Sequence, residues 1–427
     1  MSHDTIVVGA GLAGLTAALR LTEQGQKVVI VARGIGATHL APATVDVLGY
    51  MGDERVDSPV SALPGLLSSA PGHPYGRMSL EQIDASLEWF RARLQSLGYA
   101  GGLDRNMLFP SALGVARPSA LAPRTMLGGD LREGGRFLFV GLRGFKDFHA
   151  SLLAENLAHA GLPRPVTTRA LELDPPADRR GDQSGRLLAR RFDSGELADW
   201  LVRSLQGKVD ADEHIGLPPI LGLRRADETM TELENRLERR VFEVPTLPPS
   251  VPGIRLYDAL TAALRKGGAR LVMNASVIGA HARDGRIESV DVASAASTVS
   301  YRTDAVILAS GGFPSGGLTL DSRGAARETA FDLPVAGVPG DGASRFVAGY
   351  FDDQPMSRAG VAVDEMLRPL GRDGGAAYGN LHAAGAVLAG AVPWKEKSGT
   401  GISVATGYAA ADAILAPRAM RVGETAR

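Results

Sequence analysis

Apolar residues near the start of the chain follow the pattern of a strand, a tight turn and a helix. Thr5–Val8 is a short β-branched run, Gly9–Gly14 contains three glycines, and leucines then recur at helical spacing until Gly25. The following run, Lys27–Ala32, is apolar without alternation, which is typical of a parallel strand covered on both faces. The pattern therefore predicts a βαβ unit.

The middle of the chain gives weaker signals and is predicted to form a separate domain. Gly49–Gln82 is rich in Pro, Gly and Ser and is expected to be irregular, whereas Leu80–Leu97 has the spacing of an amphipathic helix. A strand at Arg136–Val140 and a helix at Phe145–His159 repeat the strand–turn–helix order. Pro175–Arg191 is polar and is expected to be a surface loop.

Regular elements return in the last part of the chain. The proline-rich run 244–253 predicts an extended segment that leads into a helix at Ile254–Lys266. Ala305–Ala309 is an apolar strand that ends in small residues, and the Gly-rich segment 399–401 precedes a predicted helix at Ile402–Leu415.

Composition excludes several classes of protein. The 427 residues suggest two or three domains, at roughly 150 residues each. The 46 basic and 47 acidic side chains give no cationic surplus for nucleic acid. The absence of cysteine excludes disulfides, Cys-ligated zinc, a Cys nucleophile and iron–sulfur ligation by this chain, and no histidine spacing suggests a metal site.

Other familiar patterns are also absent from the sequence. There is no Gly-x-Ser-x-Gly elbow and no Gly-x4-Gly-Lys-Ser/Thr loop, which argues against a hydrolase. No basic start of a signal peptide precedes the first strand, and no apolar run approaches the ~20 residues that span a bilayer. We therefore expect a soluble protein of a reducing compartment.

The spacing Gly9-x-Gly11-x-x-Gly14 lies where a strand passes into a helix. There the first glycine makes the turn, the second admits a phosphate, and the third lets the helix pack on the strand. The helix N-terminus offers N–H groups to the anion. The motif in this context predicts a nucleotide or flavin site, with a glycine turn used only for packing as the alternative.

An acidic residue that would hold a ribose hydroxyl is missing after the second strand. No Asp or Glu occurs between Glu23 and Asp46, and the strand runs into Arg33. This disfavours NAD and leaves an FAD ribose without its customary acceptor. The positive charge of Arg33 suits a terminal phosphate, as in FMN or NADP, although Arg33 could also be a solvated turn residue.

Two later segments have the form of flavoprotein motifs. Asp304–Gly312 and Asn380–Ala386 are similar to strands of flavoproteins with two dinucleotide-binding domains, and Ser398–Ser403 opens a helix. In those enzymes this helix directs its N-terminus at the flavin. We therefore predict an α/β fold: a Rossmann-like flavin-binding domain of this type, in two parts (1–50 and 246–427), with an inserted α/β or α+β cap domain (51–245).

Several longer stretches carry a resemblance to a known family. They are Val31–Gly34, His73–Tyr75, Leu247–Arg255, Leu308–Leu318 and Asp364–Pro369. Together with the glycine turn, they make the chain resemble the B subunit of the bacterial anaerobic glycerol-3-phosphate dehydrogenase along nearly its whole length. The sequence departs from the family pattern at Gly399–Gly401, which is less rich in glycine and cysteine.

The resemblance implies a flavin-dependent oxidation of glycerol 3-phosphate to dihydroxyacetone phosphate. It also implies FMN in this subunit, with FAD as the alternative, and two partners: a catalytic flavoprotein subunit and an iron–sulfur subunit. The iron–sulfur subunit would dock the complex on the inner, cytoplasmic face of the cell membrane and pass electrons to quinone. Two other interpretations stay open: a non-catalytic subunit that relays electrons, and a succinate- or fumarate-type flavin oxidoreductase.

Alcohol oxidation needs a base for the hydroxyl proton, and a phosphorylated substrate needs fixed cations. His39 and His73 are the candidate bases, and Arg255 and Arg368 are the candidate phosphate ligands; a surface charge or a satisfied turn residue is the competing interpretation for each. The residues predicted to contact the cofactor are Gly9, Ala10, Gly11, Leu12, Ala13, Gly14, Ala32, Arg33, Gly34, Thr38, Ala309, Ser310, Gly311, Gly385, Gly399, Thr400, Gly401 and Ile402.

Overall fold

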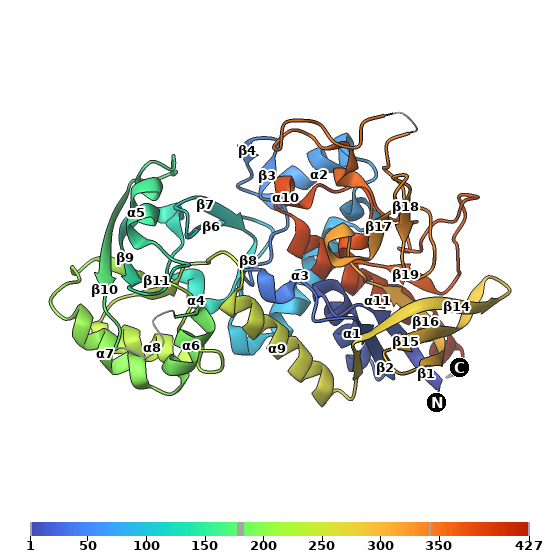
Figure 1. The fold of residues 1–427 in the computed structure, drawn as a ribbon, viewed down its shortest axis with the longest axis horizontal. Coiled ribbons are helices and arrows are strands. Elements are labelled where there is room, and N and C mark those ends of the chain that lie inside the picture. The colour runs from blue at the N-terminus through green and yellow to red at the C-terminus, as the bar shows by residue number, and fades with distance from the viewer. Residues whose placement is uncertain (1, 177–182, 341–342, 426–427) are drawn as a thin grey trace.

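A mainly parallel sheet forms the centre of the larger of two lobes (Figure 1). The computed structural model describes residues 2–176, 183–340 and 343–425. The strand order is β13-β2-β1-β16-β15-β14, and β19 pairs with β16; only the pairings of β15 with its two neighbours are antiparallel within this sheet. The strands are β1 (Ser2–Val8), β2 (Val28–Ala32), β13 (Arg270–Met273), β14 (Ala275–Arg283), β15 (Arg286–Ser294), β16 (Thr298–Leu308) and β19 (Leu381–Ala383).

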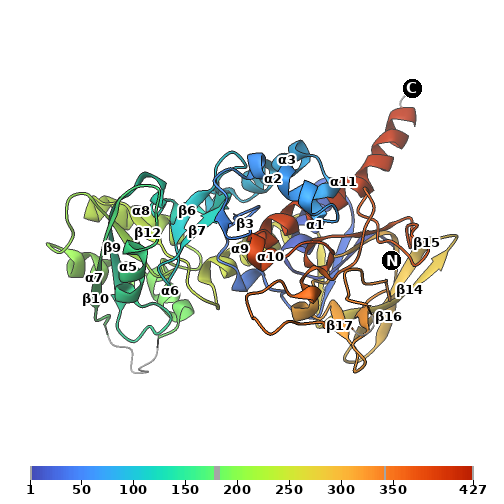
Figure 2. The ribbon, with the colours of Figure 1, turned by 90° about the horizontal axis from the view of Figure 1, so that it is seen from above.

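Helices α1 (Leu12–Glu23) and α11 (Gly399–Thr425) pack closely against each other beside this sheet. A Cβ on Gly407 would lie 2.5 Å from the Ala13 carbonyl oxygen, so the small residue lets the two helices approach. Arg20 of α1 also pairs with Asp412 of α11 at 2.8 Å. Figure 2 shows the end of α11 extending beyond the lobe.

The smaller lobe has a four-stranded parallel sheet of its own, in the order β10-β9-β11-β12. Phe137, Phe139 and Phe242 are fully buried and contact one another across the sheet. This lobe is formed by the middle part of the chain. Its elements are β9 (Gly135–Leu142), β10 (Val166–Leu173), β11 (Glu213–Leu217), β12 (Val241–Glu243), α5 (Ala150–Ala158), α6 (Gly185–Asp193), α7 (Glu196–Leu205) and α8 (Ala226–Leu237).

Further helices and strands complete the described chain. The remaining helices of three or more residues are α2 (Pro59–Ser69), α3 (Leu80–Arg93), α4 (Arg124–Leu127), α9 (Val251–Lys266), α10 (Pro393–Glu396), η1 (Thr38–Leu40), η2 (Pro74–Arg77), η3 (Gln95–Leu97), η4 (Leu131–Glu133), η5 (Phe313–Ser315), η6 (Pro355–Arg358) and η7 (Gly385–Val387). The remaining strands are β3 (Tyr50–Met51), β4 (Glu54–Arg55), β5 (Ala100–Gly101), β6 (Met107–Pro110), β7 (Ala116–Ser119), β8 (Leu121–Ala122), β17 (Leu318–Leu320) and β18 (Ala326–Glu328). Among the described residues, no helix is both long and apolar enough to cross a membrane.

The two larger hydrophobic cores among the described residues draw on different parts of the chain. Buried residues from 56 to 103 pack with the strands and helices of the larger lobe. The second core draws only on residues 108–244. The segment that includes α2 and α3 therefore shares the core of the larger lobe.

Several helices differ from the sequence-based prediction, and α5 for example begins at Ala150 rather than at Phe145. Gly49–Gln82 is not irregular throughout, because it contains α2, which the Ser58 hydroxyl caps. Two leucines of α2, Leu63 and Leu66, are buried in the first core. The predicted loop Pro175–Arg191 contains the start of α6, whose Leu188 and Phe192 enter the second core; residues 177–182 lie outside the described residues. Helix α9 begins at Val251 rather than Ile254, because the Ser250 hydroxyl caps its first turn.

Candidate functional site

The first glycine turn adopts the geometry that its spacing predicts. Gly9 has φ +114°, and a Cβ there would lie 2.2 Å from the Ala309 carbonyl oxygen. A Cβ on Gly14 would lie 2.1 Å from the Gly9 carbonyl oxygen, so helix α1 packs directly on the turn. Gly11 occupies the N-cap of α1 with open space on its side-chain face and no side-chain cap. The start of α1 is therefore free to receive an anion.

Parallel strand ends from distant parts of the chain meet beside this turn. The Ala309 N–H donates to the Val8 carbonyl, which places the end of β16 beside the end of β1. Gly385, after β19, has φ +77° and lies so close to α1 that a Cβ would be 2.6 Å from the Ala13 side chain. Ligands of open α/β sheets bind at such carboxyl ends. Ten predicted contact residues are buried, whereas Arg33 and Gly34 are exposed. The buried ones are Ala10, Leu12, Ala13, Gly14, Ala32, Thr38, Ala309, Gly385, Gly401 and Ile402.

Four polar side-chain atoms on the segments that follow β2 and β16 are buried without a hydrogen-bond partner. They are Thr38 Oγ1, His39 Nδ1, Thr44 Oγ1 and Ser310 Oγ. Buried polar atoms are nearly always paired in folded proteins, and these four would be available to hydrogen-bond a bound polar group. Together with the glycine turn they fit a flavin. Thr44 was not predicted, since a lone threonine in an apolar run gives no sequence signal.

Arg33 extends from the end of β2 across to the loop that follows β16. Its guanidinium donates to the Gly316 carbonyl at 2.6 Å and to the Ser315 carbonyl at 3.3 Å. The side chain is therefore anchored beside the cofactor edge of the sheet. Because a guanidinium carries five N–H groups, further donors remain for a phosphate.

Gly399–Gly401 form the first turn of α11, and do not precede the helix as the sequence predicts. The Thr400 hydroxyl accepts from the Asp46 N–H at 2.8 Å, and the Gly401 N–H donates to the Asp46 carbonyl at 3.0 Å. A Cβ on Gly401 would lie 2.5 Å from the Tyr75 hydroxyl oxygen. The glycine thus lets the loop at Asp46 close over the start of α11.

A buried ion pair that the sequence analysis missed lies next to this turn. Lys397 Nζ lies 2.8 Å from the Asp46 carboxylate and also contacts the Pro118 carbonyl and the Ser119 hydroxyl. Burial lowers the pKa of Lys397 to about 8 against the attraction of Asp46, so the ammonium is still charged at neutral pH. Burial would raise the pKa of Asp46, but Lys397 and Arg117 outweigh it and lower that pKa. This cluster ties β7 to the start of α11.

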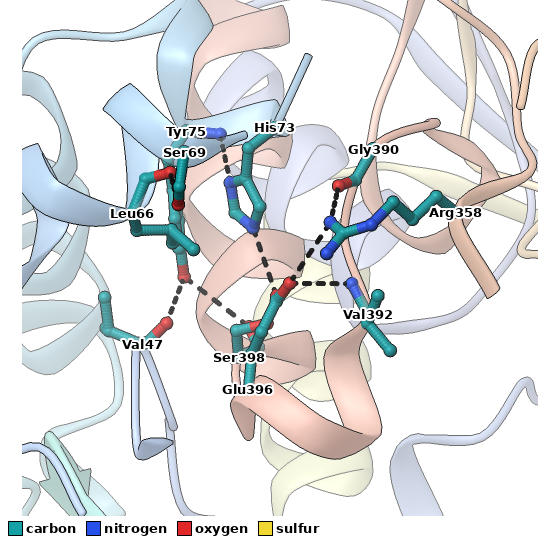
Figure 3. Close-up of polar contacts among 10 residues, drawn as sticks. All are labelled: Val47, Leu66, Ser69, His73, Tyr75, Arg358, Gly390, Val392, Glu396 and Ser398. Carbon is teal, nitrogen blue, oxygen red and sulfur yellow. Dashed lines mark hydrogen bonds and ion pairs between the residues drawn. The ribbon is translucent and has the colours of Figure 1, made fainter. Parts of the chain in front are cut away.

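His73 lies in a second buried polar cluster at the same turn (Figure 3). Its Nδ1 accepts from the Tyr75 N–H at 3.2 Å, and its Nε2 lies 3.2 Å from the Glu396 carboxylate. The Ser398 hydroxyl and the Val392 N–H also donate to Glu396. Burial would raise the pKa of Glu396, but these hydrogen bonds, led by that from His73, lower it. Both nitrogens of the predicted base are therefore engaged within the protein.

Acidification is expected to destabilise the protein through these two carboxylates. Asp46 and Glu396 have folded-state pKa values below their ordinary 3.8 and 4.5, so the unfolded chain binds protons first as the pH falls. The stability they contribute is present above about pH 4.5 and is lost below it. Urea unfolding at pH 7, 5 and 3.5 measures this loss, and Glu396→Gln should reduce it. A midpoint that does not change down to pH 3.5 would contradict the expectation.

The other predicted cations are also paired. Arg255 on α9 donates to both carboxylate oxygens of Glu243 and to the Gly222 carbonyl, and both charged side chains are buried. Its charge is therefore already neutralised. Arg368 is half exposed and pairs with Asp364 at 2.8 Å. His39, His73, Arg255 and Arg368 share no hydrogen bond with one another in the described part of the chain.

A cavity of about 390 Å³ lies where the two lobes meet. Ala43 and Arg255 contribute to its wall, and Thr125 Oγ1 is buried there without a partner. Carboxylates outnumber cations around it, and the charge of Arg255 is neutralised by Glu243. The cavity is therefore poorly suited to a dianionic phosphate. Its charged lining residues are Arg224, Arg255, Asp227, Glu228 and Asp258.

The match to a protein-family model agrees with a flavin site in this chain. A family model described as an FAD binding domain matches residues 4–402. A solved 3-ketosteroid Δ1-dehydrogenase from Sterolibacterium denitrificans aligns with 97% of this chain and 100% of its own, at 13% identity and a TM-score of 0.47.

Two curated relatives align from end to end, and both are named as B subunits of an anaerobic glycerol-3-phosphate dehydrogenase. The relative from Halobacterium salinarum, whose name carries the word probable, is 34% identical over 427 residues, covering 97% of this chain and 98% of the relative. The relative from Yersinia pseudotuberculosis is 33% identical over 434 residues, covering 98% and 100%. The chain therefore belongs to the FAD binding domain family and, within it, to the B subunits of anaerobic glycerol-3-phosphate dehydrogenases.

Proposed function

We propose that this chain takes part in the flavin-dependent oxidation of sn-glycerol 3-phosphate to dihydroxyacetone phosphate, as one subunit of a larger dehydrogenase. The observation that carries the proposal is the end-to-end similarity to relatives with that name. The glycine turn and the four unpartnered polar atoms support flavin binding by this chain itself.

FMN is the proposed flavin, with FAD as the alternative. The phosphate would lie at the start of α1, where Gly11 leaves the helix uncapped. No acidic residue follows β2 to hold the ribose of a second nucleotide, and Arg33 spans from β2 to the carbonyls after β16 at that edge. Both features favour a flavin with a terminal phosphate.

When bound, the flavin would accept the hydride that leaves the substrate carbon. We assign His39 as the base that accepts the hydroxyl proton. Its Nδ1, on the segment after β2, is buried without a partner. Arg368 is the proposed phosphate ligand, since its half-exposed guanidinium can reach solvent while Asp364 orients it. His73 and Arg255 are instead assigned to holding the fold, because their polar atoms are engaged in buried pairs.

The proposed partners are a catalytic flavoprotein subunit and an iron–sulfur subunit that passes the electrons to quinone. The cysteine-free sequence supports this division, since an iron–sulfur cluster needs ligands that this chain lacks. The complex would lie on the inner face of the cell membrane through its partner subunits.

A non-catalytic relay subunit is the second candidate. The specific observation in its favour is that two of the four candidate catalytic residues, His73 and Arg255, are in buried structural pairs. In that case the flavoprotein partner would oxidise the substrate, and this chain would only bind flavin and pass electrons onward.

Two measurements on the purified chain test these proposals. The mass of the released chromophore should be that of FMN, and a dinucleotide mass would replace it with FAD. Anaerobic addition of glycerol 3-phosphate should then bleach the flavin of the isolated chain, whereas succinate should not. Bleaching only after the flavoprotein partner is added would favour the relay function, and a colourless chain that takes up no flavin would contradict both.

A further inference from the structure

Five apolar side chains near α10 face solvent together. Tyr350 is 80% exposed, Phe351 is 76% exposed and Phe346 is 61% exposed, values far above those of core aromatics. Val347 and Trp394 are also exposed. We call these five residues the aromatic patch. Single exposed apolar residues are ordinary, but a cluster of this kind is typical of a surface that binds a protein, a membrane or a ligand.

The patch is held in place by hydrogen bonds of its own loop. The Gln354 side chain accepts from the Val347 N–H at 3.1 Å and donates to the Gly349 carbonyl at 2.7 Å. The Tyr350 and Phe351 rings meet edge to face, with centroids 5.0 Å apart. The aromatic side chains are thus presented outward on a braced loop.

An ion pair joins this loop to α10, and α10 leads directly to the cofactor end of α11. Lys395 lies 2.6 Å from Asp353, which places Trp394 next to the loop. Arg358, which follows the loop, donates to the Gly390 carbonyl and lies 3.9 Å from Glu396 (Figure 3). The aromatic patch therefore lies beside α10, which leads directly into α11.

The size of the patch matches the apolar centre of a protein interface. Aromatic side chains bury 150–250 Å² each when covered, so the exposed fractions here amount to about 500 Å². A stable interface covers about 800 Å² on each partner, of which roughly 60% is apolar.

The charges on the rim point to a protein rather than a lipid surface. Asp352 and Asp353 directly follow the aromatic pair and are exposed. Carboxylates are costly to bury in hydrocarbon, and anionic head groups would repel them. Asp353 is already paired with Lys395, so a protein partner would offer a cation to Asp352.

We propose that the aromatic patch is the docking surface for the subunit that receives electrons from this chain. The inference rests on the proposed function, because it requires a flavin here and a redox partner in the same complex. The partner would present an apolar surface with basic side chains at its edge, next to the start of α11.

The test measures binding of the purified chain to the iron–sulfur subunit and, in a separate assay, to the flavoprotein subunit; the proposal predicts the following change for the iron–sulfur subunit alone. The double variant Tyr350→Ser/Phe351→Ser should raise the dissociation constant by more than about tenfold, as expected for aromatic hot spots. Ile278→Ser is the matched control, because Ile278 is 56% exposed on the distant β14 and should leave binding unchanged. Flavin content and bleaching should stay at wild-type levels in both variants.

Each other outcome overturns the proposal. Equal affinity of the double variant and the wild type places the interface elsewhere. A loss of binding to phosphatidylglycerol vesicles with the complex intact assigns the patch to lipid, and a loss of self-association with the complex intact assigns it to a second copy. If the wild-type chain binds neither of the other two subunits, the docking proposal fails, while chromophore mass and bleaching still decide the proposed function separately.

Discussion

Replacing Arg255 with Ala is expected to destabilise the protein by about 3–5 kcal/mol, rather than mainly to weaken substrate binding. The Arg255 side chain is 5% exposed and its partner Glu243 is fully buried, so the substitution leaves an unpaired carboxylate in the protein interior. Arg255 lies on α9 and Glu243 on β12, which means that the pair also fastens the two lobes together. Thermal unfolding followed by circular dichroism measures the loss.

Two further variants make this expectation specific. Arg368→Ala removes a cation from a pair whose side chains are 37% and 24% exposed, and it should cost less than about 1 kcal/mol. The double variant Arg255→Met/Glu243→Leu removes both buried charges and should regain most of the stability that Arg255→Ala loses. Equal melting temperatures for Arg255→Ala and Arg368→Ala would show that the buried pair has no special weight.

Replacing Lys397 with Met is expected to be similarly costly, by about 3–5 kcal/mol. It leaves the Asp46 carboxylate, whose side chain is 9% exposed, without its closest cation. The Asp46 backbone also holds the first turn of α11, so the variant should lose flavin as well as stability. Melting temperature and the ratio of flavin to protein absorbance measure the two effects.

The neighbouring lysine provides a matched comparison. Lys395 pairs with Asp353 at the surface, where the carboxylate side chain is 88% exposed, and Lys395→Met should change stability by less than about 1 kcal/mol. Asp46→Asn/Lys397→Met should recover much of the loss, because no buried charge remains. Retention of full flavin content by Lys397→Met would contradict the part assigned to this pair.

Local patterns in the sequence were sufficient for the nucleotide-binding half of the fold. The strand–turn–helix at Gly9–Gly14 is encoded mainly by neighbouring residues, and a side chain on Gly9 or Gly14 would clash with nearby backbone. The small residues that end β16 were recognised in the same way. The helices α2 and α6 were missed because their serine caps lie inside stretches that are rich in turn-forming or polar residues.

The roles of the charged residues could not be read from local sequence. Nothing near Arg255 in the chain signals that Glu243 will neutralise it, and nothing near His73 signals that Glu396 will occupy its ring nitrogen. The Asp46–Lys397 pair joins distant segments that meet only after the sheet and α11 have packed. Such long-range pairings decide whether a charged side chain is available for chemistry.

The two cores also impose an order of assembly during synthesis. The second core uses only residues 108–244 and can form as soon as that stretch has left the ribosome. The first strand can pair with β2 early, but its other neighbour, β16, ends only at Leu308. One edge of β1 therefore lacks its strand partner until the last third of the chain is being made.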